Sequence, residues 1–229
     1  MRAPLVSVIV PVLNEASLLP GLLDHLEALP GRFELIVVDG GSDDGSAALA
    51  EEHRAVSRLV RAPRGRALQM NAAAKAARGD VFLFLHADTR LPQGAYDELV
   101  RASGAGVVGG NFALRYDGGD LFSRLLGAWN ALQRRGGVYY GDSAIWVTAE
   151  VFHRLGGYRE LPVMEDYDLA RRLERQGRTS CLAGPAVSSD RRWRRLGLLR
   201  TVASWIAIRL LFIAGVPPAR LARLYPQAR

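Results

Sequence analysis

A carboxylate just past a predicted strand is the feature of this chain best placed for chemistry. Five apolar residues, 81–85, follow Gly79-Asp80 and are typical of a strand buried on both faces of a parallel sheet. Asp88 comes shortly after them. Ligands of open α/β sheets bind beyond the carboxyl ends of the strands, so an acid there can meet a ligand or a cation. A lone aspartate could equally cap a helix or a turn, but other acids follow other strands.

Asp39 is a second acid of this kind. It follows the predicted strand 33–38 and opens a glycine-rich turn, residues 40–45, where a carboxylate can accept hydrogen bonds from a ribose or a base. The glycine spacing is not that of a dinucleotide-binding loop. It is not a P-loop either, since Gly45 is followed by Ser46 and no lysine. An ordinary Asp-Gly turn is the structural alternative.

Basic and polar residues gather at a predicted helix start, residues 64–71. The guanidinium groups of Arg64 and Arg66 precede Asn71 there. Arginine forks and the amides of a helix N-terminus both favour anions, so this segment suits a diphosphate. A solvated basic loop would explain the same residues.

Glu165 and Asp166 begin another predicted helix, with Asp168 close behind. Acids in a first turn are stabilised by the helix dipole, which is the default explanation. If these three acids face Asp88 across a cleft, one of their carboxylates could act as general base towards an acceptor hydroxyl.

Residues 139–143 precede a predicted strand and contain Tyr140 and Asp142, candidates for an acceptor pocket. A hairpin turn is the alternative. His86 is the histidine nearest to this chemistry. The spacing of the histidines and the cysteine does not fit a three-ligand zinc site, and the sequence contains no Gly-x-Ser-x-Gly motif of a hydrolase.

The elements that must position these side chains alternate between strand and helix. Up to Pro92 we predict strands at 6–12, 33–38, 57–61 and 81–85, and helices at 18–29, 47–54 and 67–77. This order predicts an α/β fold, a Rossmann-like, mostly parallel sheet flanked by helices. Beyond it we predict helices at 94–102, 120–135, 150–155 and 164–176, and strands at 107–116 and 143–148. Leu121, Leu125, Trp129 and Leu132 fall on one side of the 120–135 helix.

One domain accounts for the 229 residues, and 49% hydrophobic content supplies a core. We expect a nucleotide-binding half at 1–92, an acceptor-side half at 93–185 and a basic helical tail at 186–229. Residues 1–185 hold 21 basic and 22 acidic residues, whereas 186–229 hold nine and one, so the tail carries the net charge of +7. The body is neutral and the tail is cationic, and we expect no nucleic-acid partner.

The tail has an apolar stretch, 196–216, that Arg200 and Arg209 interrupt, so it is too charged to span a bilayer. It could lie on an anionic membrane surface as a basic amphipathic helix. It could equally pack on the domain. The single cysteine, Cys181, fits a reducing compartment, and the apolar run 5–13 contains Pro11 and no cleavage site. We therefore expect a cytoplasmic protein, with the tail available to the inner face of the membrane.

Taken together, these residues resemble the family-2 glycosyltransferases of the GT-A fold over nearly the whole chain. The segments that match are Val8-Ile9-Val10-Pro11-Val12-Leu13-Asn14-Glu15, Val37-Val38-Asp39-Gly40-Gly41-Ser42-Asp43-Asp44-Gly45, His86-Ala87-Asp88 in the D-x-D position, and Glu165-Asp166. Residues 85–92, 140–142 and 164–166 are also similar to a small bacterial subgroup associated with arsenosugar biosynthesis.

The resemblance implies an inverting hexosyltransferase that uses a nucleotide sugar, with a UDP-sugar as the expected donor. Asp88 would bind Mg²⁺ or Mn²⁺, hard cations that take carboxylate and phosphate oxygens. Asp166, beside Glu165, would activate the acceptor hydroxyl, on a small molecule or a lipid. The residues expected around the donor are Pro11, Leu13, Glu15, Asp39, Arg66, Asn71, His86 and Ala87.

Two departures from the family pattern matter. His86 replaces the first acid of D-x-D, which would weaken metal binding, although a neutral imidazole could still hydrogen-bond a ribose. Arg191-Arg192-Trp193 resembles the Arg-Trp motif of processive members without its glutamine-led part. We therefore place Trp193 near the acceptor and infer no polymer synthesis.

Two other functions compete with sugar transfer. A nucleotidyltransferase would need a glycine-rich N-terminal loop with a lysine, whereas residues 11–15 contain no glycine. A nucleotide-binding or membrane-surface scaffold without activity is the other, and His86 is the feature that favours it.

Overall fold

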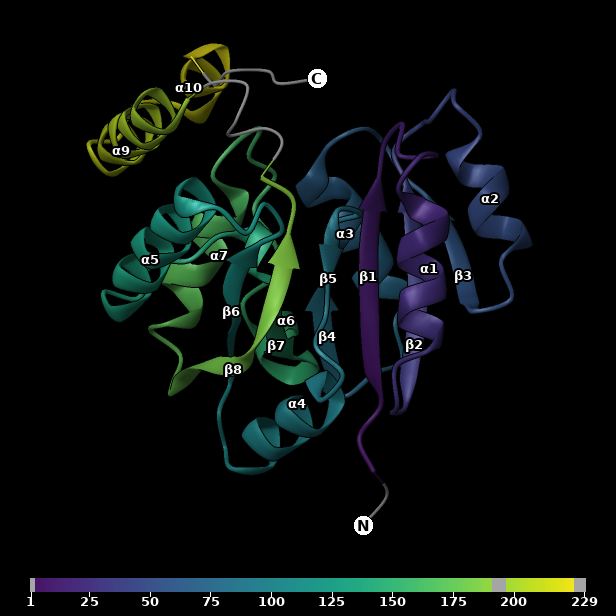
Figure 1. The fold of residues 1–229 in the computed structure, drawn as a ribbon. Coiled ribbons are helices and arrows are strands. Elements are labelled where there is room, and N and C mark those ends of the chain that lie inside the picture. Colours follow the sequence, from purple (N-terminus) through teal and green to yellow (C-terminus); the bar gives the residue numbers. More distant parts are fainter. Residues whose placement is uncertain (1–2, 191–196, 225–229) are drawn as a thin grey trace.

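A computed structural model of the chain describes residues 3–190 and 197–224 (Figure 1). The first part alternates as predicted: β1 (Val6–Val12), α1 (Leu19–Glu27), β2 (Phe33–Asp39), α2 (Ser46–Glu52), β3 (Val56–Arg61), α3 (Arg66–Ala76) and β4 (Val81–Phe84). The second part contains β5 (Thr89–Arg90), α4 (Ala95–Gly104), β6 (Gly109–Tyr116), α5 (Leu121–Arg135), the short 3₁₀ helix η1 (Gly141–Ser143), β7 (Ile145–Thr148), α6 (Ala149–Arg154), α7 (Glu165–Leu173) and β8 (Thr179–Ser188).

The strands form one sheet in the order β3-β2-β1-β4-β7-β6-β8-β5. β3, β2, β1 and β4 are parallel, as is the β6 and β8 pair, whereas β7 and β5 run antiparallel to their neighbours. The predicted α/β class with a mainly parallel sheet is therefore confirmed. The carboxyl ends of β1, β2 and β4 lie at one edge of the sheet. The loops that follow these ends contain residues predicted to bind the nucleotide-sugar donor.

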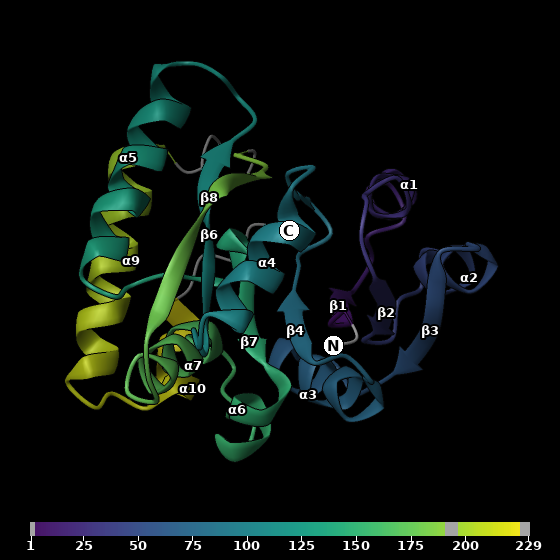
Figure 2. The same cartoon turned by 90° about the horizontal axis from the view of Figure 1, so that it is seen from below.

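Alternation along the strands builds two cores, one on each face of the sheet. Val6, Val8, Val10 and Val12 pack with α1, α2 and α4, and Ile9 packs with α3, α6 and α7 on the other face. The layers are visible in Figure 2. Helices on both faces explain why these strands are almost continuously apolar.

The sheet curls because β4 and β5 are neighbours in sequence but far apart in strand order. Five Cα steps, from Phe84 to Thr89, reach about 18 Å when fully extended, and the four strand spacings between β4 and β5 in a flat sheet need about 19 Å. The link is not extended, since the Thr89 amide donates to the His86 carbonyl at 3.1 Å. The strands β7, β6 and β8 therefore bend around residues 85–88, the D-x-D position.

Strand β8 was not predicted, and its sequence explains why. Gly184 and Pro185 interrupt it, and both normally argue against a strand interior. The register between β6 and β8 shifts at this point, so the strand bulges around them. Glu98 of α4 accepts two hydrogen bonds from the Gly184 amide, at 3.0 and 3.2 Å, and holds the bulge.

The chain ends in α9 (Leu198–Ile213) and α10 (Pro218–Leu224), which pack on the domain. α9 is apolar around much of its circumference, with Arg200 and Arg209 as its charged residues. The predicted basic amphipathic character is therefore not confirmed, and the arginine cluster 191–195 lies outside the described residues. In the described part of the chain, no helix has both the length and the apolar character needed to cross a membrane.

Candidate active site

The loops after β1 and β2 are joined to each other by hydrogen bonds. The Asn14 amide donates to Ser42 Oγ at 3.0 Å, and the Asp43 amide donates to Asn14 Oδ1 at 3.0 Å. The Glu15 amide donates to Ser46 Oγ at 2.9 Å. Segments predicted to bind the nucleoside, residues 11–15 and 39–45, thus form one surface before any ligand arrives.

Gln69 is a positioning residue that the sequence analysis missed. Its buried side-chain amide donates to the carbonyls of Val12 and Val38, at 2.8 and 2.9 Å, and so joins the ends of β1 and β2. A β-carbon on residue 40 would lie 2.9 Å from this amide, which explains why this residue is a glycine. The signal in the sequence is weak because a glutamine in an alanine-rich helix is usually exposed.

Asp39 is buried, and its carboxylate turns back into its own loop. Oδ2 accepts from the Gly41 amide at 3.0 Å, and both oxygens accept from the Ser42 amide at 3.1 and 3.2 Å. This is the Asp-Gly turn expected as the structural alternative. Its role towards a nucleoside stays a prediction, for which unused lone pairs remain on the carboxylate.

Asp88 and Asp142 both act on the hydroxyl of Tyr116. That hydroxyl donates to Asp142 Oδ2 at 3.1 Å and accepts from the Asn130 amide at 3.2 Å. Burial raises the pKa of Tyr116 well above its usual value, with contributions from the charges of Asp142 and Asp88. Asp142 therefore contacts this tyrosine directly, and Asp88 lies within electrostatic reach of it.

Gly141 lies between His86 and Asp166. Its amide donates to Asp166 Oδ2 at 2.8 Å. A β-carbon on Gly141 would lie 2.8 Å from His86 Nε2 and 3.5 Å from Asp166 Oδ2, so both side chains approach the same point. The structure thus joins the D-x-D segment and the acidic pair through a glycine that was not among the predicted residues.

Glu165 is the acid in this region whose protonation is most perturbed. Burial, followed by repulsion from Asp166, raises the pKa of Glu165 to about 7, while Arg66 acts in the opposite direction. Arg66 is therefore within electrostatic reach of the acidic pair. The basic helix start and the acidic helix start, about 100 residues apart in the sequence, face the same region.

Backbone strain also concentrates here. Among the described residues, three that are not glycine have positive φ: Asn14 at 58°, Ala144 at 53° and Met164 at 67°. Asn14 lies in the predicted nucleoside loop, Ala144 follows η1, and Met164 precedes Glu165. Such conformations cost about 1 kcal/mol or more each and persist where the surroundings hold them, which is common at functional sites.

Asn71 has a structural role in the described fold. Its amide donates to the Tyr158 carbonyl at 2.8 Å, and its Oδ1 accepts from the Tyr158 amide at 2.9 Å. The predicted contact of Asn71 with the donor stays a prediction, which would have to be made in addition to these bonds.

Asp168 stabilises the position of α7, the helix that carries Glu165 and Asp166. Its buried carboxylate pairs with Arg172 at 2.7 Å and Arg159 at 3.1 Å. Arg172 also donates to the carbonyls of Leu155 and Gly157, at 3.0 and 2.8 Å. This network fixes α7 against the preceding turn.

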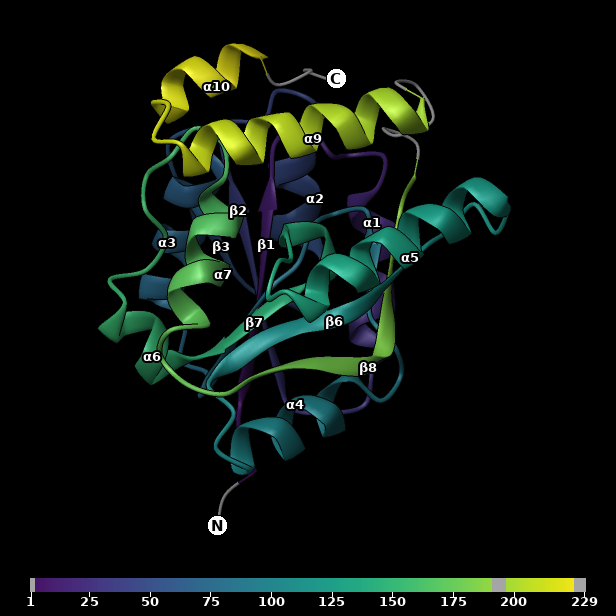
Figure 3. The same ribbon diagram turned by 90° about the vertical axis from the view of Figure 1, so that its left-hand side faces the viewer.

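Helix α9 covers the residues that flank Gly141 and Asp166. The rings of Tyr140 and Trp205 meet edge to face with centroids 4.8 Å apart, and those of Tyr167 and Phe212 are 5.9 Å apart (Figure 3 shows α9 above α7). Burial raises the pKa of Tyr140. The packed arrangement of the tail is thus the one observed for α9. Trp193, another predicted acceptor residue, lies outside the described residues.

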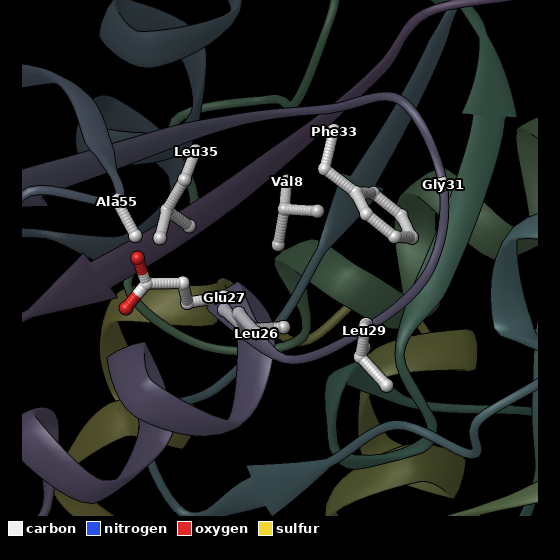
Figure 4. A pocket seen from close by; sticks show the side chains of 8 residues that line it. All are labelled: Val8, Leu26, Glu27, Leu29, Gly31, Phe33, Leu35 and Ala55. Carbon is white, nitrogen blue, oxygen red and sulfur yellow. The ribbon is translucent and has the colours of Figure 1, made fainter.

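Two hollows of the described structure differ in how they relate to this constellation. One of about 460 Å³ is bordered by α5, β6 and the segment 138–143, including Tyr140, and its size suits a small ligand. The other, about 170 Å³, lies between α1 and the sheet and is lined by apolar side chains and Glu27 (Figure 4). It is smaller than usual ligand sites and contains none of the predicted site residues.

The donor set at Asp88 fits a hard cation that takes its other ligands from a diphosphate. Within the described ranges, one group of three acidic or histidine side chains has its ligand atoms within 4.8 Å of one another: Asp24, Glu27 and His53, none of which was predicted as a site residue. Mg²⁺ commonly uses one or two protein carboxylates together with substrate phosphates, so Asp88 does not need such a cluster.

Comparison with known proteins identifies the family. A family model described as glycosyl transferase family 2 matches residues 7–159, which is more than half of the chain. The chain belongs to glycosyl transferase family 2. The suspected family is thereby confirmed, and the narrower resemblance to an arsenosugar subgroup stays a prediction.

Curated relatives of this glycosyltransferase cover part of it. The undecaprenyl-phosphate 4-deoxy-4-formamido-L-arabinose transferase of Pseudomonas aeruginosa is 39% identical over 152 residues, 60% of this chain and 44% of that protein. A PGL/p-HBAD biosynthesis glycosyltransferase of Mycobacterium bovis is 51% identical over 45 residues, 19% of this chain and 18% of its own length. The match spans less than half the length of these relatives.

Solved structures share the fold at low sequence identity. A mannosyltransferase from Pyrobaculum calidifontis, in complex with GDP-Man and Mn²⁺, has a TM-score of 0.65 and 24% identity over 82% of this chain and 57% of its own. A glucosyl-3-phosphoglycerate synthase from Mycobacterium tuberculosis, in complex with Mn²⁺ and UDP, has a TM-score of 0.59 and 22% identity over 93% of this chain and 81% of its own. The predicted GT-A fold is confirmed by this likeness.

Proposed function

We propose that this glycosyltransferase moves a sugar from a UDP-sugar to an acceptor hydroxyl with inversion. Residues 1–92 would hold the donor, and residues 93–185 would supply the acceptor side and the base. The observation that carries the proposal is the approach of Asp166 and His86 to the same point beside Gly141, because it brings the acidic pair to the D-x-D segment.

Asp166 would act as the general base. Oδ2 is oriented by the Gly141 amide, and Oδ1 accepts from the Tyr167 amide at 2.7 Å, so the carboxylate is fixed before an acceptor binds. The acceptor hydroxyl would give its proton to Asp166 while its oxygen bonds to the anomeric carbon. The bond from that carbon to the diphosphate oxygen would break, and the diphosphate would leave with the electron pair.

Asp88 would hold the divalent cation, Mg²⁺ or Mn²⁺, together with donor phosphates. When bound, such a cation neutralises charge on the departing diphosphate. Arg66 lies near enough to the acidic pair to add a second positive charge on the donor side. The Mn²⁺ in the two similar solved structures supports this choice of cation.

A lipid phosphate is a second candidate acceptor. It is favoured by the relatives named as undecaprenyl-phosphate transferases, 39% identical to this chain over 152 residues. A phosphate oxygen is already anionic at neutral pH and needs no base. Asp166 would then matter much less.

The decisive experiment measures single-turnover sugar transfer by wild type and Asp166→Asn, from a panel of UDP-sugars, to an alcohol and to a polyprenyl phosphate. With a hydroxyl acceptor, the variant should transfer at least about a hundredfold more slowly while binding the donor normally. Equal rates for wild type and variant with every acceptor would contradict the role of Asp166. No turnover of any donor by the wild type would contradict transfer itself.

A further inference from the structure

Exposed apolar side chains concentrate on the last helices and on α5. Among the described residues, eight large apolar side chains are exposed, and seven of them lie on α5, α9 and α10. They are Leu121, Leu125 and Leu132 of α5, Leu210, Leu211 and Ile213 of α9, and Leu224 of α10. The eighth, Leu49, is on α2. A cluster of this kind on one part of a molecule marks an interaction surface.

Helices α5 and α9 are neighbours that hold each other in place. Leu126 and Phe122 of α5 pack with Val202 and Trp205 of α9, and Arg209 donates to the side chain of Gln133. Figures 2 and 3 both show the two helices next to each other. The inner faces are thus used, and the exposed leucines belong to the outer faces.

The charge on these helices has one sign. The sequences of α5, α9 and α10 contain seven arginines and no aspartate or glutamate. Arg124, Arg135, Arg200, Arg220 and Arg223 are exposed. A second copy of the chain would set these five exposed arginines against five, which disfavours self-association through this surface.

We propose that the outer faces of α5, α9 and α10 dock on the surface of an anionic lipid bilayer. Leucines beside arginines, with no acid among them, match the two attractions that hold a helix at such a surface. The 16 residues of α9 measure about 24 Å, less than the roughly 30 Å of a bilayer core, and the inner face is packed on the domain. The helix therefore lies on the membrane and does not cross it.

Docking in this way would place the bilayer next to the candidate active site. Trp205 and Phe212, on the inner face of α9, contact Tyr140 and Tyr167, which adjoin Gly141 and Asp166. Only this consequence, access of a lipid-linked acceptor, rests on the proposed function. The binding itself does not.

The test is sedimentation of the full chain with sucrose-loaded vesicles, made of phosphatidylcholine alone or mixed with phosphatidylglycerol. The wild type should bind the mixed vesicles, and added salt should weaken binding. Leu210→Asp with Ile213→Asp, and separately Leu125→Asp with Leu132→Asp, should each weaken it at least about tenfold. Leu49→Asp, a matched change at the exposed leucine of α2, should bind like the wild type.

The proposal is overturned if the wild type does not bind mixed vesicles, if both double variants bind normally, or if Leu49→Asp loses as much as they do. It is also overturned if light scattering shows a wild-type dimer that these variants dissociate while no vesicle binding occurs. Circular dichroism checks folding of each variant. Hydrolysis of the donor without vesicles should be unchanged in the double variants, which separates loss of docking from loss of catalysis.

Discussion

The backbone amide of Gly141 donates a hydrogen bond to Asp166 Oδ2 at 2.8 Å, while the same glycine leaves no room for a β-carbon beside His86. This contact joins η1, α7 and the segment after β4 at one point. It is the relationship on which a role for Asp166 as base depends, because a base must be oriented before it can take a proton.

Gly141→Ala should reduce kcat by roughly a hundredfold. The new β-carbon would lie 2.8 Å from His86 Nε2, and the backbone shift that relieves this contact would move the amide that orients Asp166; a shift of about 1 Å at a reacting group can have this effect. Steady-state kinetics at saturating donor measures it. Gly94→Ala, at a position where no atom lies within 4 Å of the added carbon, is the control and should retain activity.

Protonation of Glu165 should make stability depend on pH. Its pKa is about 7 in the fold and 4.5 as a reference value, so between these pH values the folded state holds a proton that the unfolded chain releases. The free energy of unfolding should fall as the pH rises through this window, by up to about 1.4 kcal/mol per pH unit, and level off above it.

Glu165→Gln removes this titration. The variant should be more stable than wild type above pH 7 and should lack the decline from acidic to neutral pH. Denaturant unfolding across the pH range, with a chelator present, measures both. Glu160→Gln, at an exposed position shortly before it, should keep the wild-type profile, and a wild-type curve that is flat through the window would count against the burial argument.

Asp88→Asn should abolish the Mn²⁺-dependent part of donor affinity, whereas His86→Ala should only reduce it. A carboxylate is a hard ligand for the cation, while the imidazole of His86 packs against Gly141. Calorimetry with UDP, with and without Mn²⁺, separates the two effects. Equal affinity of the Asp88 variant and the wild type in the presence of Mn²⁺ would refute this metal assignment.

Asp168→Ala should lower the free energy of unfolding by about 3 kcal/mol. It removes a buried carboxylate with ion pairs to Arg172 and Arg159, and Arg172 is itself largely buried. Urea unfolding measures the change. Glu150→Ala, which breaks the exposed pair with Arg154, should cost no more than about 0.5 kcal/mol, so a similar loss in both variants would contradict the importance of burial.

Much of the fold follows from periodicity. The apolar runs of β1, β2 and β4 and the leucine spacing of α1 each determine an element locally, and their order requires a parallel sheet. Strand β8 escaped prediction because Gly184 and Pro185 are tolerated only through its pairing with β6, which is a long-range event. The stripe of Leu121, Leu125 and Leu132 was visible in the sequence as well. Periodicity shows that such a face exists, but what covers it depends on the rest of the molecule.

The sequence by itself determined that Asp39, Asp88 and the pair Glu165-Asp166 follow or begin elements of an α/β fold, because strand and helix signals are local. Only the tertiary structure decided that Asp166 meets Gly141 beside His86, and that Asp39 turns back into its own loop. These contacts join residues through the curl of the sheet, and the direction of a side chain at the end of a loop depends on everything that packs around it.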